Sequence, residues 1–192
     1  LGVIGLGKIG KEVIKRSLSY DMQILGYDPY VNKDQFNDDE VRVADLDYVV
    51  EHSDFITLHL PINDKTRNLF DYDRLNKMKK TSRIINVARG GIINEKDLAK
   101  SLNENIIAGA AIDVFENEPI PNDNDLITAK NILLTPHLGA STVEAKEGVT
   151  DSICQQMIDY FNKNKLSNAL NIPISDPALL NKLSSYYELA EL

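Results

Sequence analysis

The stretch Gly5-Leu6-Gly7-Lys8-Ile9-Gly10 decides the fold of this 192-residue chain. It follows the apolar run of residues 1–4, which is typical of a buried strand, and it leads into residues 8–20, where apolar side chains recur at helical spacing. Glycines at these three positions allow a tight turn, the close approach of a pyrophosphate to the backbone, and close packing of the helix on the strand. The stretch therefore predicts a strand–turn–helix unit that binds a dinucleotide.

Asp28 ends the second apolar run, residues 23–27. A carboxylate at this distance from the glycines accepts hydrogen bonds from the ribose hydroxyls of an adenosine and would repel a 2′-phosphate. We therefore predict NAD, rather than NADP, as the cofactor. The helix that begins near Lys8 directs its open N–H groups and its positive dipole end at the phosphates. The cofactor-binding residues expected from this unit are Gly5, Gly7, Lys8, Ile9, Gly10 and Asp28.

Strand and helix patterns alternate along the rest of the chain. Strands that are joined through helices form right-handed parallel units, so we predict an α/β, Rossmann-type doubly wound fold: a mostly parallel sheet with helices on both faces. Residues 29–40 are polar and are expected to be irregular, and Asn94 is expected to cap a helix with Asp97 in the capping-box position. The further strands are expected at residues 23–27, 54–60, 83–87, 106–114 and 131–135, and the further helices at residues 45–52, 71–79, 94–103 and 142–162.

Composition excludes several classes of protein. The formal net charge of −8 argues against a nucleic-acid-binding surface. The chain has no run of about eighteen apolar residues, so no membrane span is expected. Cys154 is the only cysteine, which excludes an internal disulfide and a cysteine-based metal cluster and favours a reducing, cytoplasmic location. No metal site is expected, because the acidic stretch Asn37-Asp38-Asp39-Glu40 is typical of a solvated loop.

Arg89, Glu118 and His137 are the candidate catalytic residues, because each follows a predicted strand. Ligands of parallel sheets bind beyond the carboxyl ends of the strands, where Gly5 and Asp28 are also expected. Moving a hydride between a nicotinamide and a 2-hydroxy acid needs one group that exchanges the hydroxyl proton and another that holds the carboxylate. A histidine paired with a carboxylate suits the first role, and an arginine suits the second.

At these residues the chain resembles the nucleotide-binding domain of the D-isomer-specific 2-hydroxyacid dehydrogenases, with its closest likeness in the phosphoglycerate branch of that family. The resemblance covers nearly the whole chain, and several separate blocks occur in one order. These blocks are the glycine stretch, Gly26-Tyr27-Asp28-Pro29, Leu58-His59-Leu60-Pro61, Ala88-Arg89-Gly90-Gly91, Ala110-Ala111-Ile112-Asp113-Val114-Phe115 and His137-Leu138-Gly139-Ala140-Ser141-Thr142.

The resemblance implies a role for each site residue. His137 would be the acid/base, Glu118 its partner and Arg89 the anchor of the substrate carboxylate, while Asp113 would hold the nicotinamide carboxamide. By contrast, His59 lies inside an apolar strand, and we expect it in the core. The further cofactor contacts implied are Leu60, Pro61, Val87, Ala88 and Arg89 along the strand ends, and His137, Leu138, Gly139 and Ala140 around the nicotinamide.

The resemblance also implies how the chain is organised. Residues 1–163, including the long helix 142–162, are expected to form the NAD-binding domain. Residues 164–192 are expected to belong to a substrate domain whose N-terminal part is absent, because family members build that domain mainly from residues before the first strand. We therefore expect a fragment that is inactive by itself. A homodimer through the nucleotide domain is implied, with the long helix and residues 92–130 as candidate contacts.

Three functions remain open at this stage. The favoured one is NAD-dependent oxidation of 3-phosphoglycerate to 3-phosphohydroxypyruvate, the entry to serine biosynthesis. A sister activity, glyoxylate/hydroxypyruvate reductase or D-lactate dehydrogenase, is the enzymatic alternative. An NAD(H)-gated transcriptional co-repressor of the same fold is the alternative from another class, and the catalytic residues do not exclude it because such proteins keep them. NAD is the expected cofactor, a small 2-hydroxy or 2-oxo acid is the expected substrate, and neither nucleic acid nor a membrane is an expected partner.

Overall fold

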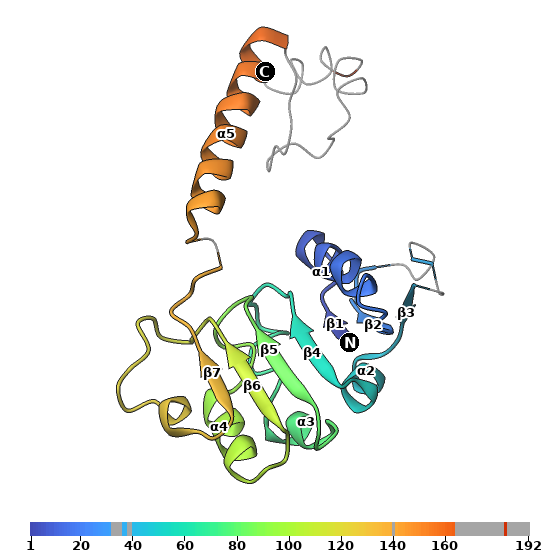
Figure 1. The fold of residues 1–192 in the computed structure, drawn as a ribbon, viewed down its shortest axis with the longest axis vertical. Coiled ribbons are helices and arrows are strands. Elements are labelled where there is room, and N and C mark those ends of the chain that lie inside the picture. The colour runs from blue at the N-terminus through green and yellow to red at the C-terminus, as the bar shows by residue number, and fades with distance from the viewer. Residues whose placement is uncertain (32–35, 38–39, 140, 164–182, 184–192) are drawn as a thin grey trace. The chain divides into compact units, whose positions relative to one another are not determined.

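A computed structural model describes residues 1–31, 36–37, 40–139, 141–163 and 183. The chain divides into two compact units, Leu1–Gly139 and Ala140–Leu192 (Figure 1). The first unit holds the whole sheet, and the described part of the second is dominated by one long helix. No helix among the described residues is long and apolar enough to cross a membrane.

The first unit is built on a seven-stranded sheet in the order β3-β2-β1-β4-β5-β6-β7. Every pair of neighbouring strands is parallel, so the predicted α/β doubly wound fold is confirmed. The chain order reverses between β1 and β4, and this switch point is where open sheets of this kind bind ligands. The strands are β1 (Gly2–Ile4), β2 (Ile24–Tyr27), β3 (Val41–Val43), β4 (Phe55–Leu58), β5 (Arg83–Asn86), β6 (Gly109–Ile112) and β7 (Ile132–Leu134).

Helices cover both faces of this sheet because neighbouring residues of a strand point to opposite sides. Val3 of β1 packs with Ile14 of α1 on one face, and Ile4 packs on the other face with side chains of α2, α3 and α4. All of these apolar side chains are nearly inaccessible to solvent. The helices of the first unit are α1 (Lys8–Leu18), α2 (Leu46–His52), α3 (Tyr72–Asn76) and α4 (Glu95–Asn103), and a short 3₁₀ helix, η2, spans Asp125–Thr128.

Asn94 caps α4 as predicted, since its side chain accepts a hydrogen bond from the backbone N–H of Asp97. Asp97, however, does more than serve the capping position: its carboxylate accepts from the backbone N–H of Tyr72, 3.1 Å away. The first turn of α4 is thereby fastened to the beginning of α3.

Two elements differ from the sequence-based expectation. β3 is not predicted, because its three residues follow a polar stretch and are too few to show a periodic pattern. The apolar run 106–114 predicts a long strand, but β6 covers only Gly109–Ile112. The difference arises because Asn105 has a left-handed backbone (φ 56°) and the N–H of Ile106 bonds back to Ser101. Residues 105–107 therefore close α4 before the strand begins.

The second unit contributes α5, Val143–Lys163, close to the predicted helix 142–162. Val149, Ile153, Met157 and Phe161 recur along it and are more than half exposed. The expected NAD-binding domain, residues 1–163, includes this helix, whereas the compact unit that carries the sheet ends at Gly139. The assignment of α5 to the nucleotide domain stays a prediction, and the substrate-domain segment 164–192 lies almost wholly outside the described residues.

Candidate functional site

The turn between β1 and α1 uses its three glycines in different ways. Gly5 has a left-handed backbone (φ 98°), and a Cβ there would lie 2.4 Å from the carbonyl oxygen of His59. A Cβ on Gly10 would lie 2.0 Å from the carbonyl oxygen of Gly5, so no side chain fits between helix and strand. A Cβ on Gly7 would meet no protein atom within 4 Å. The fold itself requires Gly5 and Gly10, whereas the space beside Gly7 is open to a ligand.

The beginning of α1 is suited to an anion. Gly7 is its N-cap and provides no side-chain acceptor, and the first turn carries no acidic residue. The first-turn N–H groups and the positive end of the helix dipole are therefore available for a phosphate. Lys8 and Ile9, both exposed, stand in this turn where the sequence predicts the pyrophosphate.

Asp28 follows β2 and lies beside the glycine turn. One carboxylate oxygen accepts from the backbone N–H of Leu6 and the other from that of Tyr30, both at 2.9 Å. The same carboxylate lines a pocket of about 490 Å³ together with Gly7, His59, Leu60 and Pro61. A carboxylate has about four acceptor positions, so each oxygen keeps one for a ribose hydroxyl.

His59 is less buried than the sequence suggests. It follows β4 and is half-buried, its Nε2 lies 3.1 Å from the hydroxyl of Thr57, and it lines the pocket beside Asp28. Burial lowers the pKa of His59, which favours the neutral imidazole. His59 thus lines the pocket and also packs at the end of β4.

The turn after β5 presents Arg89 to solvent. Asn86, which is buried, organises this turn: its side chain donates to the carbonyl of Arg89 at 3.0 Å and accepts from the N–H of Ala88 at 3.1 Å. Val87 is 46% exposed and is therefore accessible to a ligand at this turn. Asn86 is not predicted as a site residue, because an asparagine at a strand end carries no distinctive spacing.

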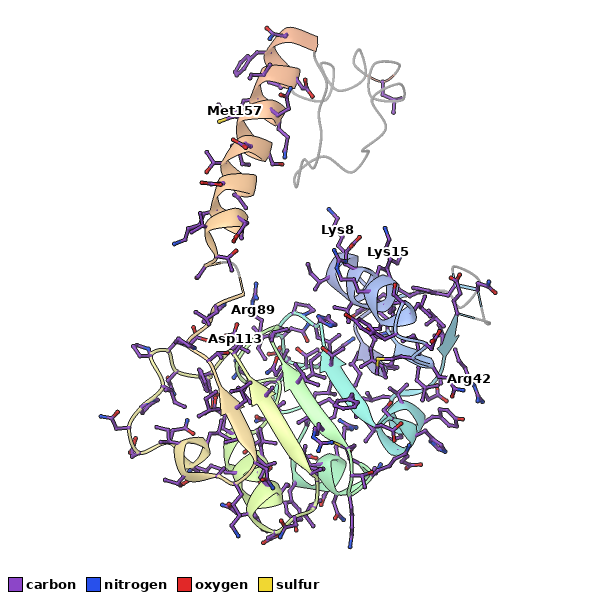
Figure 2. The ribbon with its side chains drawn as sticks, viewed as in Figure 1. Lys8, Lys15, Arg42, Arg89, Asp113 and Met157 are labelled. Atoms are coloured by element: carbon purple, nitrogen blue, oxygen red, sulfur yellow. The ribbon has the colours of Figure 1, made fainter. Side chains whose placement is uncertain are left out.

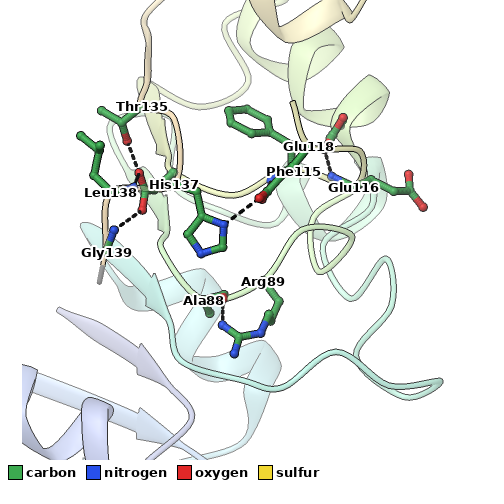
Figure 3. Close-up of polar contacts among 11 residues, drawn as sticks. Ala88, Arg89, Phe115, Glu116, Glu118, Thr135, His137, Leu138 and Gly139 are labelled. Carbon is green, nitrogen blue, oxygen red and sulfur yellow. Dashed lines mark hydrogen bonds and ion pairs between the residues drawn. The ribbon is translucent and has the colours of Figure 1, made fainter. Parts of the chain in front are cut away.

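Glu118 and His137 form the pair that the sequence predicts to be catalytic. The two side chains come from separate loops, and the Nδ1 of His137 lies 2.7 Å from one oxygen of Glu118 (Figure 3). The other oxygen of Glu118 accepts from the backbone N–H of Phe115 at 2.9 Å. The hydrogen bond from His137, and then that from Phe115, hold the pKa of Glu118 below its ordinary value. Glu118 is therefore a carboxylate at neutral pH.

The backbone of His137 is left-handed (φ 53°), a conformation that costs free energy for a residue with a side chain. Asp113, buried at the end of β6, holds the segment around it. Its carboxylate accepts from the Thr135 hydroxyl at 2.6 Å and from the backbone N–H groups of Leu138 at 2.8 Å and Gly139 at 3.1 Å. Although burial raises its pKa, these hydrogen bonds prevail and lower it. Thr135, overlooked in the sequence, is part of this support.

The structure thus gathers most of the predicted residues in the turns that follow the strands, as the labels of Arg89 and Asp113 illustrate (Figure 2). The glycine turn, Asp28, Leu60 and Pro61 surround one pocket. Arg89, Glu118 and His137 approach one another from the turns after β5, β6 and β7 (Figure 3). Ala140 lies outside the described residues. Within the described part of the chain, no cluster of three His, Cys, Asp or Glu side chains could hold a metal ion.

Residues 1–139 match the family described as D-isomer specific 2-hydroxyacid dehydrogenase, NAD binding domain. The chain belongs to this family. Its cofactor is NAD, since the matched domain is the NAD-binding one and similar structures were solved in complex with NAD. The 2-hydroxyacid dehydrogenase domain accounts for all seven strands and for the turns that carry Arg89, Glu118 and His137.

Curated relatives of this dehydrogenase domain include D-3-phosphoglycerate dehydrogenases. That of Methanocaldococcus jannaschii is 43% identical over 193 residues and that of Synechocystis is 42% identical over 191, each alignment covering all of this chain. A glyoxylate reductase from Korarchaeum cryptofilum is 35% identical over 83% of the chain. The chain spans only 37% and 34% of the two phosphoglycerate dehydrogenases. Two Arabidopsis relatives are named as chloroplastic, so the cytoplasmic location stays a prediction.

Solved structures agree with the dehydrogenase fold. D-2-hydroxyisocaproate dehydrogenase aligns with a TM-score of 0.77 at 26% identity, covering 86% of this chain and 54% of that one. NAD-dependent formate dehydrogenase from Staphylococcus aureus, in complex with NAD, aligns with a TM-score of 0.74 at 32% identity, covering 87% and 50%. The shared region is therefore about half of those dehydrogenases.

Proposed function

We propose that the whole protein is an NAD-dependent dehydrogenase that oxidises 3-phosphoglycerate to 3-phosphohydroxypyruvate, a step of serine biosynthesis. The observation that best supports a dehydrogenase activity is the 2.7 Å contact between His137 and Glu118. It lies at the same ends of the strands as Arg89 and the glycine turn. The identity of about 40% to phosphoglycerate dehydrogenases over the entire chain favours this substrate.

The cofactor would be held at two places. Its pyrophosphate would lie against Gly7 and the first turn of α1, where the structure leaves open space and N–H donors. Its adenosine would enter the pocket in which Asp28 offers acceptors to the ribose hydroxyls. Val87, Leu138 and the carboxylate of Asp113 would border the nicotinamide. When bound, NAD accepts the hydride from C2 of the hydroxy acid.

Side chains of this protein would accept the proton of the substrate hydroxyl and bind the substrate carboxylate. With Nδ1 of His137 donating to Glu118, Nε2 is the basic nitrogen that takes the proton of the substrate hydroxyl. The Glu118 carboxylate stabilises the imidazolium that results. Arg89, from the neighbouring strand end, would bind the substrate carboxylate with its guanidinium group. In the reverse reaction His137 returns its proton to the carbonyl oxygen.

Turnover assays on the full-length protein test the proposal. We expect NAD-dependent oxidation of 3-phosphoglycerate at a kcat/KM at least about tenfold above that for D-lactate or glycolate. His137→Ala should lower kcat by about 10²–10⁴-fold, because a positioned acid/base is lost, with little change in NAD affinity. Preference for glycolate would favour a glyoxylate reductase, to which relatives of 35–39% identity point. A protein with no turnover that still bound NAD would favour a co-repressor.

We also propose that the protein acts as a homodimer. Its basis is the apolar side chains of α5, of which Val149, Ile153 and Phe161 are more than half exposed and follow helical spacing. Exposed apolar surface of this kind is typical of an interface. Sedimentation of the full-length protein would test it, since a monomer at micromolar concentration would contradict the proposal.

A further inference from the structure

Glu95, outside the predicted catalytic set, contacts the loop that carries Glu118. It is the first residue of α4 and is half-buried. One of its carboxylate oxygens accepts from the backbone N–H of Glu116 at 2.7 Å, and the other accepts from the side-chain amide of Asn124 at 2.6 Å. A single carboxylate thus joins the two ends of the segment 116–124 between β6 and β7.

The backbone of Phe115 and Glu116 is the centre of this arrangement. The N–H of Phe115 donates to Glu118, and the N–H of Glu116 donates to Glu95. A Cβ on Gly90 would lie 1.9 Å from the carbonyl oxygen of Phe115, so the backbone next to Arg89 is in direct contact with Phe115. A shift of this two-residue backbone would therefore disturb both Glu118 and the turn that carries Arg89.

We propose that Glu95 is a positioning residue: by holding the Glu116 N–H and Asn124 together, it keeps Glu118 at hydrogen-bonding distance from His137. The inference rests on the proposed function, in which that pair handles the substrate proton. The two hydrogen bonds of Glu95 described above go to Glu116 and Asn124, so it acts through the loop. Sub-ångström placement of such a loop matters because proton-transfer geometry is steeply distance-dependent.

A merely structural role must be separated from positioning, because an acidic residue in the first turn also stabilises a helix. Asp97 provides the matched control: it lies in the same turn of α4, and its carboxylate binds the N–H of Tyr72 instead of the loop. Glu95→Gln and Asp97→Asn remove the same charge from the same turn. Only Glu95→Gln should disturb the catalytic pair.

The first readout is kinetic, on the full-length enzyme. Glu95→Gln places an amide donor opposite the amide of Asn124, so one hydrogen bond is lost. We expect kcat to fall about tenfold with the KM for NAD unchanged, while Asp97→Asn stays within about twofold of wild type. In a Glu118→Gln background, Glu95→Gln should have little further effect, because the two residues act through one contact.

Adding Asn124→Asp to Glu95→Gln should restore activity. The introduced carboxylate can accept from the glutamine amide and, through its second oxygen, from the N–H of Leu126, which Asn124 binds now at 2.9 Å. The double variant has the same total charge as the unmodified protein, and it keeps the hydrogen bond between positions 95 and 124 and the bond from the N–H of Leu126. Failure of the exchange to restore kcat in a folded protein would overturn the proposal, as would full additivity with Glu118→Gln.

The second readout needs no turnover. The chain has three histidines, so the ring N–H signals of His137 can be assigned by NMR. The Nδ1 of His137 lies 2.7 Å from the Glu118 carboxylate, so its proton reports directly on this contact. Lengthening the contact should move the Nδ1–H signal upfield in Glu95→Gln but not in Asp97→Asn. An unmoved signal would refute the positioning role even if the proposed substrate proves wrong.

Discussion

Two carboxylates at strand ends, Asp28 and Asp113, show how single residues prepare the site. Asp28 binds the backbone N–H groups of Leu6 and Tyr30, and Asp113 binds those of Leu138 and Gly139. Each therefore orders a loop that borders the proposed cofactor site before any ligand arrives. Loss of either carboxylate should affect both the loop and the ligand contact.

The first residue-scale prediction concerns the choice of cofactor. Because Asp28 presents negative charge to the adenosine pocket, NAD should bind at least about tenfold more tightly than NADP, or ~1.4 kcal/mol. Asp28→Ala should narrow that difference, since the repulsion of a 2′-phosphate disappears. Titration of both cofactors by calorimetry measures it. Equal affinities for the unmodified protein would contradict the assignment of Asp28.

The second concerns pH. The contact with His137 lowers the pKa of Glu118 from its ordinary value of 4.5. The contact therefore stabilises the folded protein fully above pH 4.5, and this stabilisation is lost as the pH falls through the lowered pKa. Glu118→Gln removes the charge that stabilises the imidazolium. In the direction of hydroxy-acid oxidation, the acidic limb of the kcat/KM profile should move to lower pH and kcat should fall. An unshifted limb would show that Glu118 does not act on His137.

Residue types alone predict the reactive groups but not their supports. Arg89, Glu118 and His137 are found because their chemistry suits proton exchange and carboxylate binding. Thr135 and Glu95 are not, because their roles lie in hydrogen bonds between segments about twenty residues apart, and Asn86 is not, because its role lies in a short turn with no distinctive spacing. Such contacts leave no period or spacing for a single sequence to show.

At the scale of elements, the regular periods were the reliable signal. The first strand, the glycine turn and α1 form as predicted because each has a complete local pattern. β3 has only Val41 and Val43 as apolar residues, and it becomes a strand through its parallel pairing with β2. The apolar residues 106–108 lie in the turn between α4 and β6 for a similar reason: contacts with other segments, rather than propensity, decide their conformation.

The glycine turn gives an element-scale prediction. Gly7→Ala should change the free energy of unfolding by no more than about 1 kcal/mol, because its Cβ would meet no protein atom and only the N-cap preference changes. It should nevertheless weaken NAD binding about tenfold or more, since the methyl group occupies the space of the pyrophosphate.

Gly10→Ala is the matched comparison in the same turn. Its Cβ would lie 2.0 Å from the carbonyl oxygen of Gly5, so α1 must move away from β1. We expect a loss of stability of about 1–3 kcal/mol, the usual cost of overpacking. Chemical denaturation and NAD titration of both variants separate the two roles. A Gly7→Ala protein that bound NAD normally would argue against the pyrophosphate position.

At the scale of the whole molecule, the chain contains the NAD-binding domain and covers about a third of its phosphoglycerate dehydrogenase relatives. We predict that these 192 residues bind NAD but turn over 3-phosphoglycerate at less than about 1% of the full-length rate. The proposed cofactor contacts lie, except for Ala140, within residues 1–139, the part that matches the NAD-binding family, whereas exclusion of water during hydride transfer needs a second wall. Parallel fluorescence titration and turnover assays check this. Full activity from this chain alone would overturn it.

The parallel sheet has a further consequence, for the speed of folding. No two of its strands are joined by a tight hairpin: Ile24 pairs with Val41, and Gly2 pairs with both Leu25 and the distant Ile56. Each pairing must therefore close a long loop before any hydrogen bond compensates for the lost chain entropy. The central strand β1 depends on partners from both sides. During synthesis, β4 must therefore leave the ribosome before β1 can pair on both sides. Until then, the apolar strands of the sheet are exposed to chaperones and to aggregation.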